Sequence, residues 1–398
     1  MARALAITAL VLFAWAAHAQ TDLDELERHE AERAQAFSDG FREIIDELNR
    51  GSFDRFVNAI DRSAMLERIF GLRLIDQKMK RDFGDQMKEQ GRFAGFIASS
   101  YQEEAKDGIK AMLLLVESRG DRGRAVVRFD MPYFQANYVE YDLRLHDDNR
   151  IEIVDWTDYG WGHVFSDRMG LAMVQAQPNP NAVRKLVDFP SVQQSQVFQL
   201  TEVLKATRDR KFDRLFQIID LLDPEMRRQR VVWKLSLDAT RESRKRREQR
   251  RVLQAIDEYY ASDALFALPL LDYYFPDRQY QKAYDALVRV RDKLRIDDAL
   301  TNARLSAALL VMENVDEANA MADKAVAQEP GLELAWWSQF RARVAAGNYE
   351  SALEPASQLA TEFGHRLDEE TLAKDPSMRD FARSAEYRRW RSEDAGSD

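Results

Sequence analysis

Three short segments in the second half of the chain decide its fold: YQKA at 280–283, VDEA at 315–318 and YESA at 349–352. Each segment ends in alanine, and the three alanines lie 35 and 34 residues apart. A period of this length is typical of proteins built from stacked pairs of helices. Alanine leaves room where the two helices of a pair approach each other closely. The spacing therefore predicts a helical repeat over residues 261–365.

Further residues keep the same spacing. Ala325 and Pro330 follow the second segment, and Trp336 precedes the third. On these residues the segment resembles the tetratricopeptide-repeat (TPR) family. The resemblance implies a solenoid whose first helices form a concave face for an unidentified protein or peptide partner. It places the protein-binding residues on those helices: Tyr273, Tyr274, Asn302, Leu305, Trp337 and Arg341.

The regions around this repeat also have helical patterns. We expect degenerate helix pairs over residues 192–260, and a capping helix and tail over 366–398, since the end of a repeat array needs a cover. Residues 173–191 contain three of the ten prolines of the chain and predict a linker. Together these regions predict an all-α, TPR-like solenoid in the second half of the chain.

The first half of the chain contains a different pattern. Between residues 111 and 159 it changes to β-rich runs that are separated by turn signals. The four runs cover residues 111–118, 124–130, 137–146 and 150–159. Short links between consecutive strands predict an antiparallel sheet.

Helical patterns precede these strands from residue 22 to residue 101. We therefore predict an α+β domain over residues 20–172, with helices packed on one face of a four-stranded antiparallel sheet. This layout resembles the cone-shaped α+β folds of nuclear-transport-factor-2-like (NTF2-like) and cystatin-like proteins. The resemblance implies a conical pocket on the concave face of the sheet.

The last predicted strand contains a carboxylate in an unusual place. Strict alternation puts Asp155 on the apolar face with Ile153, and Trp156 on the other face. A carboxylate on an apolar face needs a hydrogen-bond partner. In a cone, Asp155 would line a candidate pocket with Tyr141 and His163, as acid and base. We favour the simpler interpretation that Asp155 caps the end of the sheet through the backbone or a tyrosine hydroxyl.

A basic run occupies residues 241–251, with seven basic residues and two acidic ones. Its centre is the patch Arg244, Lys245, Arg246 and Arg247. Such a run could contact an acidic partner or an anionic membrane surface. It could also be a solvated helix face that forms ion pairs with neighbouring helices, and this is the interpretation we favour.

The first residues of the chain have the pattern of a secretory signal. Arg3 precedes an apolar run of about thirteen residues, and Ala17-His18-Ala19 fits a cleavage site. This run is shorter than the roughly 20 apolar residues of a membrane-spanning helix. We therefore expect a signal peptide over residues 1–19, export of a soluble protein to a bacterial periplasm, and no integral membrane span.

Composition excludes several classes of function. The chain has 398 residues and a formal net charge of −10, which argues against nucleic acid as a partner. It contains no cysteine, and its five histidines lack the spacing of metal ligands. It also lacks a phosphate-binding loop and a nucleophile elbow. We therefore expect no cofactor, no metal and no catalytic residue.

These observations predict a non-enzymatic, exported TPR-repeat protein that mediates protein–protein interaction or envelope assembly. The alternative belongs to a different class. In it the first domain is a small-molecule-binding protein or an enzyme that uses the conical pocket, and the helical repeats support it.

Overall fold

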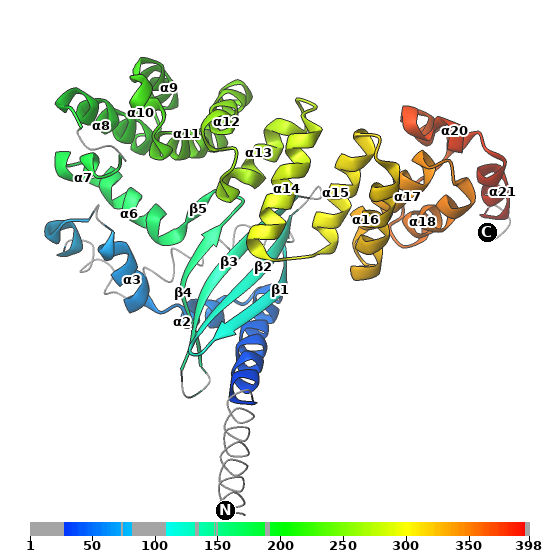
Figure 1. The fold of residues 1–398 in the computed structure, drawn as a ribbon, viewed down its shortest axis with the longest axis horizontal. Helices are drawn as coiled ribbons and strands as arrows, with labels where there is room; N and C mark the ends of the chain where they lie inside the picture. The colour runs from blue at the N-terminus through cyan, green and yellow to red at the C-terminus, as the bar shows by residue number, and fades with distance from the viewer. Residues whose placement is uncertain are drawn as a thin grey trace, which may run out of the picture. The chain divides into compact units, whose positions relative to one another are not determined.

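The chain forms two compact units. The computed structural model describes residues 28–72, 75–81, 109–131, 135–146, 148, 150–187 and 192–394. The sheet unit comprises Met1–Asp158 and His163–Asp209, and the helical unit comprises Tyr159–Gly162 and Arg210–Asp398. Figure 1 shows the elements of both units. The expected signal peptide at residues 1–19 lies outside the described residues.

The sheet unit contains an antiparallel sheet of five strands in chain order, rather than the four that we predicted. The strands are β1 (Lys110–Arg119), β2 (Arg122–Met131), β3 (Gln135–Leu145), β4 (Ile151–Asp158) and β5 (His163–Val164). The antiparallel order is confirmed. The sequence did not reveal β5 because this strand has only two residues, which is too short for an alternating pattern.

One extra residue in β4 changes which side chains share a face. Asp155 pairs with Asp142, but the next pair along β3 joins Leu143 to Ile153. Val154 is therefore the extra residue of a β-bulge, and a one-residue shift moves the following side chains to the opposite face. The prediction that Asp155 shares a face with Ile153 is wrong for this reason.

Beyond the bulge, Trp156 turns to the apolar face. It pairs with Tyr141, and their ring centroids are 6.3 Å apart. Phe41 and Phe56 lie 5.3 and 6.0 Å from the Tyr141 ring. Phe41 belongs to the helix over residues 28–49, and Phe56 to α2 (Asp54–Ala59). The core of this unit is thus an aromatic cluster between these helices and one face of the sheet.

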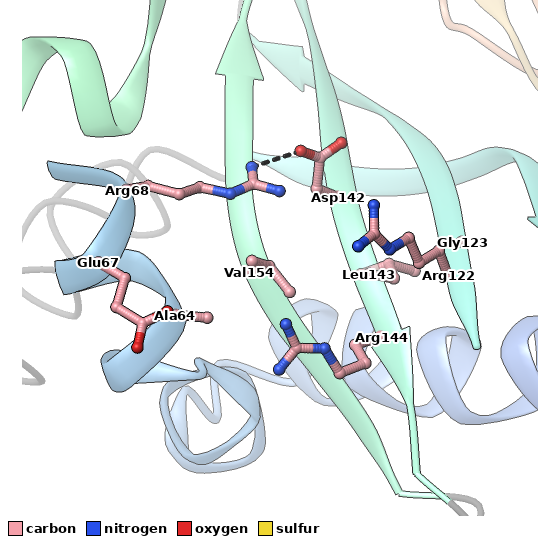
Figure 2. Close-up of a pocket in the computed structure, with 9 residues that line it drawn as sticks. All are labelled: Ala64, Glu67, Arg68, Arg122, Gly123, Asp142, Leu143, Arg144 and Val154. Carbon is pink, nitrogen blue, oxygen red and sulfur yellow. Dashed lines mark hydrogen bonds and ion pairs between the residues drawn. The ribbon is translucent and has the colours of Figure 1, made fainter. Parts of the chain in front are cut away.

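Not all helices pack on that face, in contrast to our prediction. α3 (Arg62–Gly71) follows a backbone bridge between Ile60 and Ile153 of β4. It lies beside β4 and extends Arg68 across the opposite, charged face of the sheet (Figure 2). The bridge positions α3 at this edge because it fixes the backbone immediately before the helix begins.

The expected linker at 173–191 is partly helical. α6 (Phe165–Ala176) continues into it, and α7 (Pro180–Arg184) follows. α7 begins here because the Asn179 side chain accepts a hydrogen bond from the Ala182 amide and proline is favoured at the first helical position. α8 (Gln194–Arg208) completes the sheet unit, so the division between the units falls at 209/210 rather than in the expected linker.

After the sheet unit, the described residues form only helices and their connections. The first helices of this unit are α9 (Phe212–Leu221), α10 (Pro224–Arg227), α11 (Arg230–Ser243), α12 (Arg246–Tyr260), η1 (Ala264–Phe266), α13 (Ala267–Tyr274) and α14 (Tyr280–Leu294). They are followed by α15 (Ala299–Val311), α16 (Val315–Gln328), α17 (Glu333–Ala345) and α18 (Tyr349–Thr361). The end of the chain forms α19 (Glu369–Ala373), η2 (Pro376–Met378), α20 (Arg379–Ala382) and α21 (Ala385–Asp394).

The helices from α13 to α18 form pairs with the spacing of the sequence pattern. The second helices of the pairs, α14, α16 and α18, begin at residues 280, 315 and 349. Ala283, Ala318 and Ala352 are each 0% exposed, as expected for small residues between closely packed helices. α15 packs against α16 and α17, and α17 packs against α18.

Short helices cover the end of this array. The Phe381 ring of α20 lies 5.1 Å from Phe340 of α17 and 5.8 Å from Tyr349 of α18, between ring centroids. The Trp390 indole of α21 donates a hydrogen bond to the Ser357 hydroxyl of α18 at 2.8 Å. These contacts bury the apolar surface that the last pair would otherwise expose.

Where the structure describes the chain, its helices are each too short or too polar to cross a bilayer.

Candidate functional site

Most of the residues that the TPR resemblance assigned to a partner are buried. Tyr273, Tyr274, Asn302 and Leu305 are 9, 2, 1 and 1% exposed. The Tyr274 hydroxyl donates to the Asp257 carboxylate at 2.5 Å, and burial followed by this bond raises the pKa of Tyr274. These side chains hold helices together and do not offer a surface to a partner.

Asn302 is buried although it is polar, because its side-chain amide finds hydrogen-bond partners within the protein. Its side-chain amide donates to the Asp297 carboxylate at 2.9 Å and to the Gln328 carbonyl at 2.8 Å. Gln328 in turn donates to the Asp297 backbone carbonyl at 2.9 Å. Burial raises the pKa of Asp297, but Lys324 and these hydrogen bonds outweigh it and hold that pKa below its ordinary value. The network joins the start of α15 to the end of α16.

Trp337 and Arg341 are the accessible members of the predicted set. Trp337 is half-buried and Arg341 is exposed, one turn further along α17. The Arg341 guanidinium lies 5.6 Å from the centroid of the Trp337 ring. The Trp337 indole donates to Glu333 at 3.2 Å, and Glu333 also pairs with His365 at 2.5 Å. Trp337 is therefore a fixed aromatic side chain with a cation over one face.

Spacing extends this surface to the preceding pairs. Asp272, Ala307 and Arg341 lie 35 and 34 residues apart, so they occupy equivalent places on α13, α15 and α17. Asp272 is exposed, but desolvation by the surrounding protein raises its pKa, while Arg241 and Arg304 act in the opposite direction. This carboxylate is therefore partly enclosed and feels the positive charge of both arginines.

The sequence prediction did not include Asp272 and named the neighbouring Tyr273 and Tyr274 instead. The equivalence of Asp272 to Arg341 in the repeat was the signal that could have found it. The same spacing could not have pointed to Arg241, because α11 precedes the helix pairs that follow the period. Its guanidinium donates to the Gly160 carbonyl at 2.7 Å and lies 4.8 Å from the Trp161 ring centroid, within the same unit.

The basic run is divided between paired and exposed residues. Lys245 pairs with Asp213, and Arg251 pairs with Asp220. Arg250 pairs with Asp277 at 2.8 Å. These ion pairs to other parts of the helical unit agree with the favoured interpretation of a solvated helix face. Arg244, Arg246 and Arg247 are exposed and have no ion-pair partner among the described residues.

Asp155 lies at the N-terminus of α6. Its carboxylate accepts hydrogen bonds from the Trp156 amide at 2.9 Å and from the amide and hydroxyl of Ser166 at 3.2 and 2.6 Å. Burial raises the pKa of Asp155, and these bonds together with Arg68 oppose the rise. Val164, the residue that precedes α6, provides no side-chain cap. Asp155 therefore caps this helix and not the end of the sheet; it bonds to backbone amides, as expected, but to a serine hydroxyl instead of a tyrosine.

The structure does not bring the candidate pocket residues together. Tyr141 is 0% exposed in the aromatic cluster, on the face opposite Asp155. His163 lies 3.4 Å from Arg168 of α6, between ring nitrogen and guanidinium. The bulge at Val154 separates Tyr141 from Asp155, because it turns Asp155 away from the apolar face.

A groove of about 440 Å³ lies instead between α3 and the charged face of the sheet. Figure 2 shows the residues that line it, which come from α3 and from three neighbouring strands. They are Ala64, Glu67, Arg68, Arg122, Gly123, Asp142, Leu143, Arg144 and Val154. Three arginines and two acids make this groove strongly polar.

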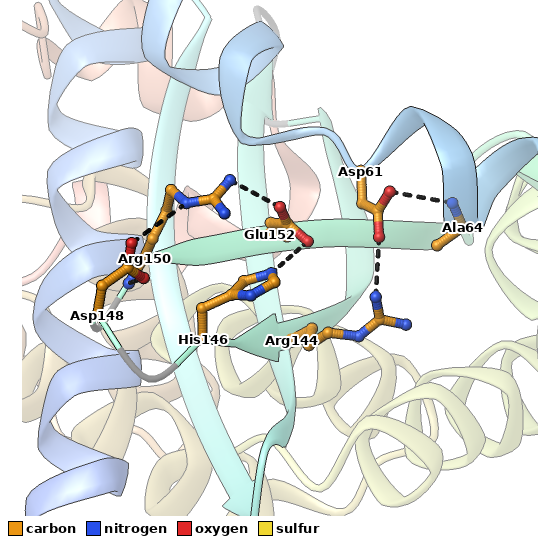
Figure 3. A network of polar contacts seen from close by, with 7 residues as sticks. All are labelled: Asp61, Ala64, Arg144, His146, Asp148, Arg150 and Glu152. Carbon is orange, nitrogen blue, oxygen red and sulfur yellow. Dashed lines mark hydrogen bonds and ion pairs between the residues drawn. The ribbon is translucent and has the colours of Figure 1, made fainter.

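Two of these arginines are held in place by carboxylates. Arg68 donates to Asp142 at 2.5 Å. Arg144 donates to Asp61 at 2.9 Å, while the other oxygen of Asp61 accepts the Ala64 amide and so caps α3 (Figure 3). The groove therefore has walls that are fixed by the same contacts that begin α3.

Asp142 and Arg144 of β3 lie on the charged face of the sheet, next to α3. The contact between α3 and this face depends on residues more than 70 positions apart, such as Arg68 and Asp142. No local pattern reports such a contact.

The comparisons with known proteins find no match, either to protein-family models or to curated proteins. Among the described residues, no group of three histidine, aspartate or glutamate side chains is arranged to hold a metal ion.

Proposed function

We propose that this chain is a non-enzymatic protein-interaction protein whose helical unit is a TPR-like solenoid. The observation that carries the proposal is the series of helix pairs with buried alanines at 283, 318 and 352. Each pair presents its first helix in an equivalent place, so the array offers a continuous row of side chains to an extended peptide or a partner's helix.

The partner surface follows from the accessible positions of the first helices. It comprises Asp272, Ala307 and Arg341, with Trp337 beside the last of these. Tryptophan and arginine dominate the binding energy of many protein interfaces. Trp337 is already held by Glu333, so it loses little conformational freedom on binding. Charges of both signs along the row favour a peptide segment that carries complementary charges.

Position-specific photocrosslinking in the cells that produce the protein tests this surface. A photoreactive amino acid at position 307 or 341 should give a discrete adduct with a partner. The matched control is position 354, because Glu354 is exposed on the second helix α18. Arg341→Glu should reduce the adduct from position 307 by about tenfold or more. Equal adducts from positions 307 and 354 would contradict the proposal.

The proposed compartment is the periplasm, with a role in envelope assembly as one use of the interaction surface. The support is the signal-like pattern before Gln20. N-terminal sequencing of the protein from fractionated cells tests this part separately. The expected result is a mature chain that begins near Gln20 in the exported fraction, and a full-length cytoplasmic chain would contradict it.

A further inference from the structure

Three arginines lie side by side across neighbouring strands of the charged face. Arg119 of β1 pairs with Arg122 of β2, and Arg122 pairs with Arg144 of β3. Residues that pair directly across strands have side chains on the same face, so these three arginines occupy neighbouring positions on it. Like charges in directly opposite positions destabilise a sheet.

The adjacent row of the same face avoids this repulsion because acidic and basic residues alternate in it. There Arg124 of β2 pairs with Glu117 of β1 and with Asp142 of β3 across the strands. The Arg124 guanidinium also contacts Glu117 and Glu140 at 3.2 and 2.9 Å. Acid and base alternate in this row, and no such alternation relieves the arginine row.

Two acids beside the arginine row, Glu152 and Asp61, are already engaged. Glu152 of β4 pairs with Arg144 across the strands, but its carboxylate contacts His146 at 2.6 Å and Arg150 at 2.8 Å (Figure 3). Of the three arginines, Arg144 is the one that donates a hydrogen bond to Asp61. Arg119 and Arg122 are exposed and have no carboxylate partner in the part of the chain that the structure describes.

We propose that the groove between α3 and the charged face binds a small multivalent anion, a phosphate or a polycarboxylate, through Arg122 and Arg144. Arg144 is oriented by Asp61 through one nitrogen, which leaves its other N–H groups for a ligand. Arg122 is free to turn toward the same ligand. Two guanidinium groups in this arrangement present paired donors that match the oxygens of phosphate or carboxylate groups.

Among the arginines that line the groove, Arg122 is the one without a carboxylate partner in the described residues. Arg68 pairs with Asp142 and also lies 3.4 Å from Asp155, and Arg144 pairs with Asp61. Asp142 is neutralised by Arg68 at 2.5 Å, and Glu67 is exposed on α3. The chain as a whole carries a net charge of −10, so its overall field repels anions. An anion that binds must therefore be recognised locally by the arginines.

Calorimetric titration of the full-length chain with pyrophosphate and with citrate, at millimolar concentration, tests this site. Arg122→Gln should weaken binding by about tenfold or more, because it removes a charge-assisted hydrogen bond. The matched control is Arg214→Gln, which removes the same charge from an exposed arginine of α9 in the other unit. This control should leave the affinity unchanged.

The unliganded variant supplies an independent readout. Without added anion, Arg122→Gln should raise the unfolding midpoint by about 1–3 °C, since it relieves repulsion with Arg119 and Arg144. Binding of pyrophosphate alone supports a phosphate ligand, and binding of citrate alone supports a polycarboxylate. Failure of both to bind, or equal weakening by the two variants, overturns the proposal, provided that circular dichroism shows both variants folded.

Discussion

The two units differ in how far apart along the chain their polar partners lie. In the helical unit, Lys245 and Asp213 are 32 residues apart, and Arg251 and Asp220 are 31 apart. In the sheet unit, Arg68 and Asp142 are 74 residues apart, and the bond from Arg144 spans 83. These two ion pairs of the helical unit join neighbouring helix pairs, whereas these two bonds of the sheet unit join α3 and its capping residue Asp61 to a strand that follows much later.

This difference shows which parts of a fold a single sequence can report. A repeat packs mainly on its neighbour, so the same short pattern recurs and becomes visible as a period. The sheet unit depends on one arrangement of distant segments, which occurs once and leaves no period. A single extra residue, Val154, then decides which side chains face the core.

The largest effect is expected from removal of an aromatic core residue in either unit. Phe340→Ala should lower the free energy of unfolding by about 3–5 kcal/mol, because the side chain is fully buried against Phe381. Phe41→Ala is the matched variant in the sheet unit, where the ring packs on Tyr141. Chemical denaturation measures the loss of unfolding free energy in each variant, and native-state hydrogen exchange locates that loss along the chain.

The difference between the two units predicts that Phe340→Ala and Phe41→Ala lose stability in different parts of the chain. Phe340→Ala should increase hydrogen exchange mainly in α17–α21, because a repeat loses stability near the altered pair. Phe41→Ala should increase exchange throughout the sheet, since its strands share one core. Uniform loss of protection over the whole helical unit in Phe340→Ala would contradict the repeat behaviour.

Deletion of Val154 tests whether the bulge determines which side chains of β4 face the core. The remaining residues would pair without a bulge, with Asp155 still opposite Asp142 and Trp156 still opposite Tyr141. We expect a folded protein that loses about 1.5–3 kcal/mol, the contribution of one buried valine. The free energy of unfolding measures the loss.

Deletion of Glu152 is the control for that experiment. No bulge is removed there, so Ile151 or Ile153 must turn toward the charged face, and the sheet unit should not fold. If both deletions behave alike, the bulge does not determine the faces of β4.

The smallest expected effect concerns the buried carboxylate. Asp155→Asn should lower the free energy of unfolding by about 1–2 kcal/mol, because it weakens the hydrogen bonds from Ser166 and Arg68. Burial raises the pKa of Asp155 in the folded protein above its ordinary value. The folded protein therefore binds the proton more strongly than the unfolded chain does.

It follows that the stability provided by Asp155 decreases as the pH rises from the ordinary aspartate pKa to the raised folded pKa. The difference in the free energy of unfolding between the wild type and Asp155→Asn should narrow over this interval. Urea denaturation of both proteins from pH 4 to neutrality measures it. A difference that widens with pH would mean that ion pairing with Arg68 outweighs burial.

Much of the architecture was predictable from the sequence, and most of the site was not. Helix pairs over 261–365 and an antiparallel sheet were predicted, because periods and turn residues are local signals. The predicted contact residues were mostly buried, since a place on the first helix of a pair does not reveal which side of that helix faces its neighbours. Asn302 is an example, because its partners Asp297 and Gln328 lie on both sides of it along the chain.

By itself, the sequence determined that this protein pairs helices at a spacing near 34 residues and places consecutive strands in an antiparallel sheet. Both features depend on hydrogen bonds and contacts between segments that are close along the chain. Only the tertiary structure decided that Asp155 faces away from the core and that Arg119, Arg122 and Arg144 share one row. Those positions depend on strand register, and register is set by which distant residues meet.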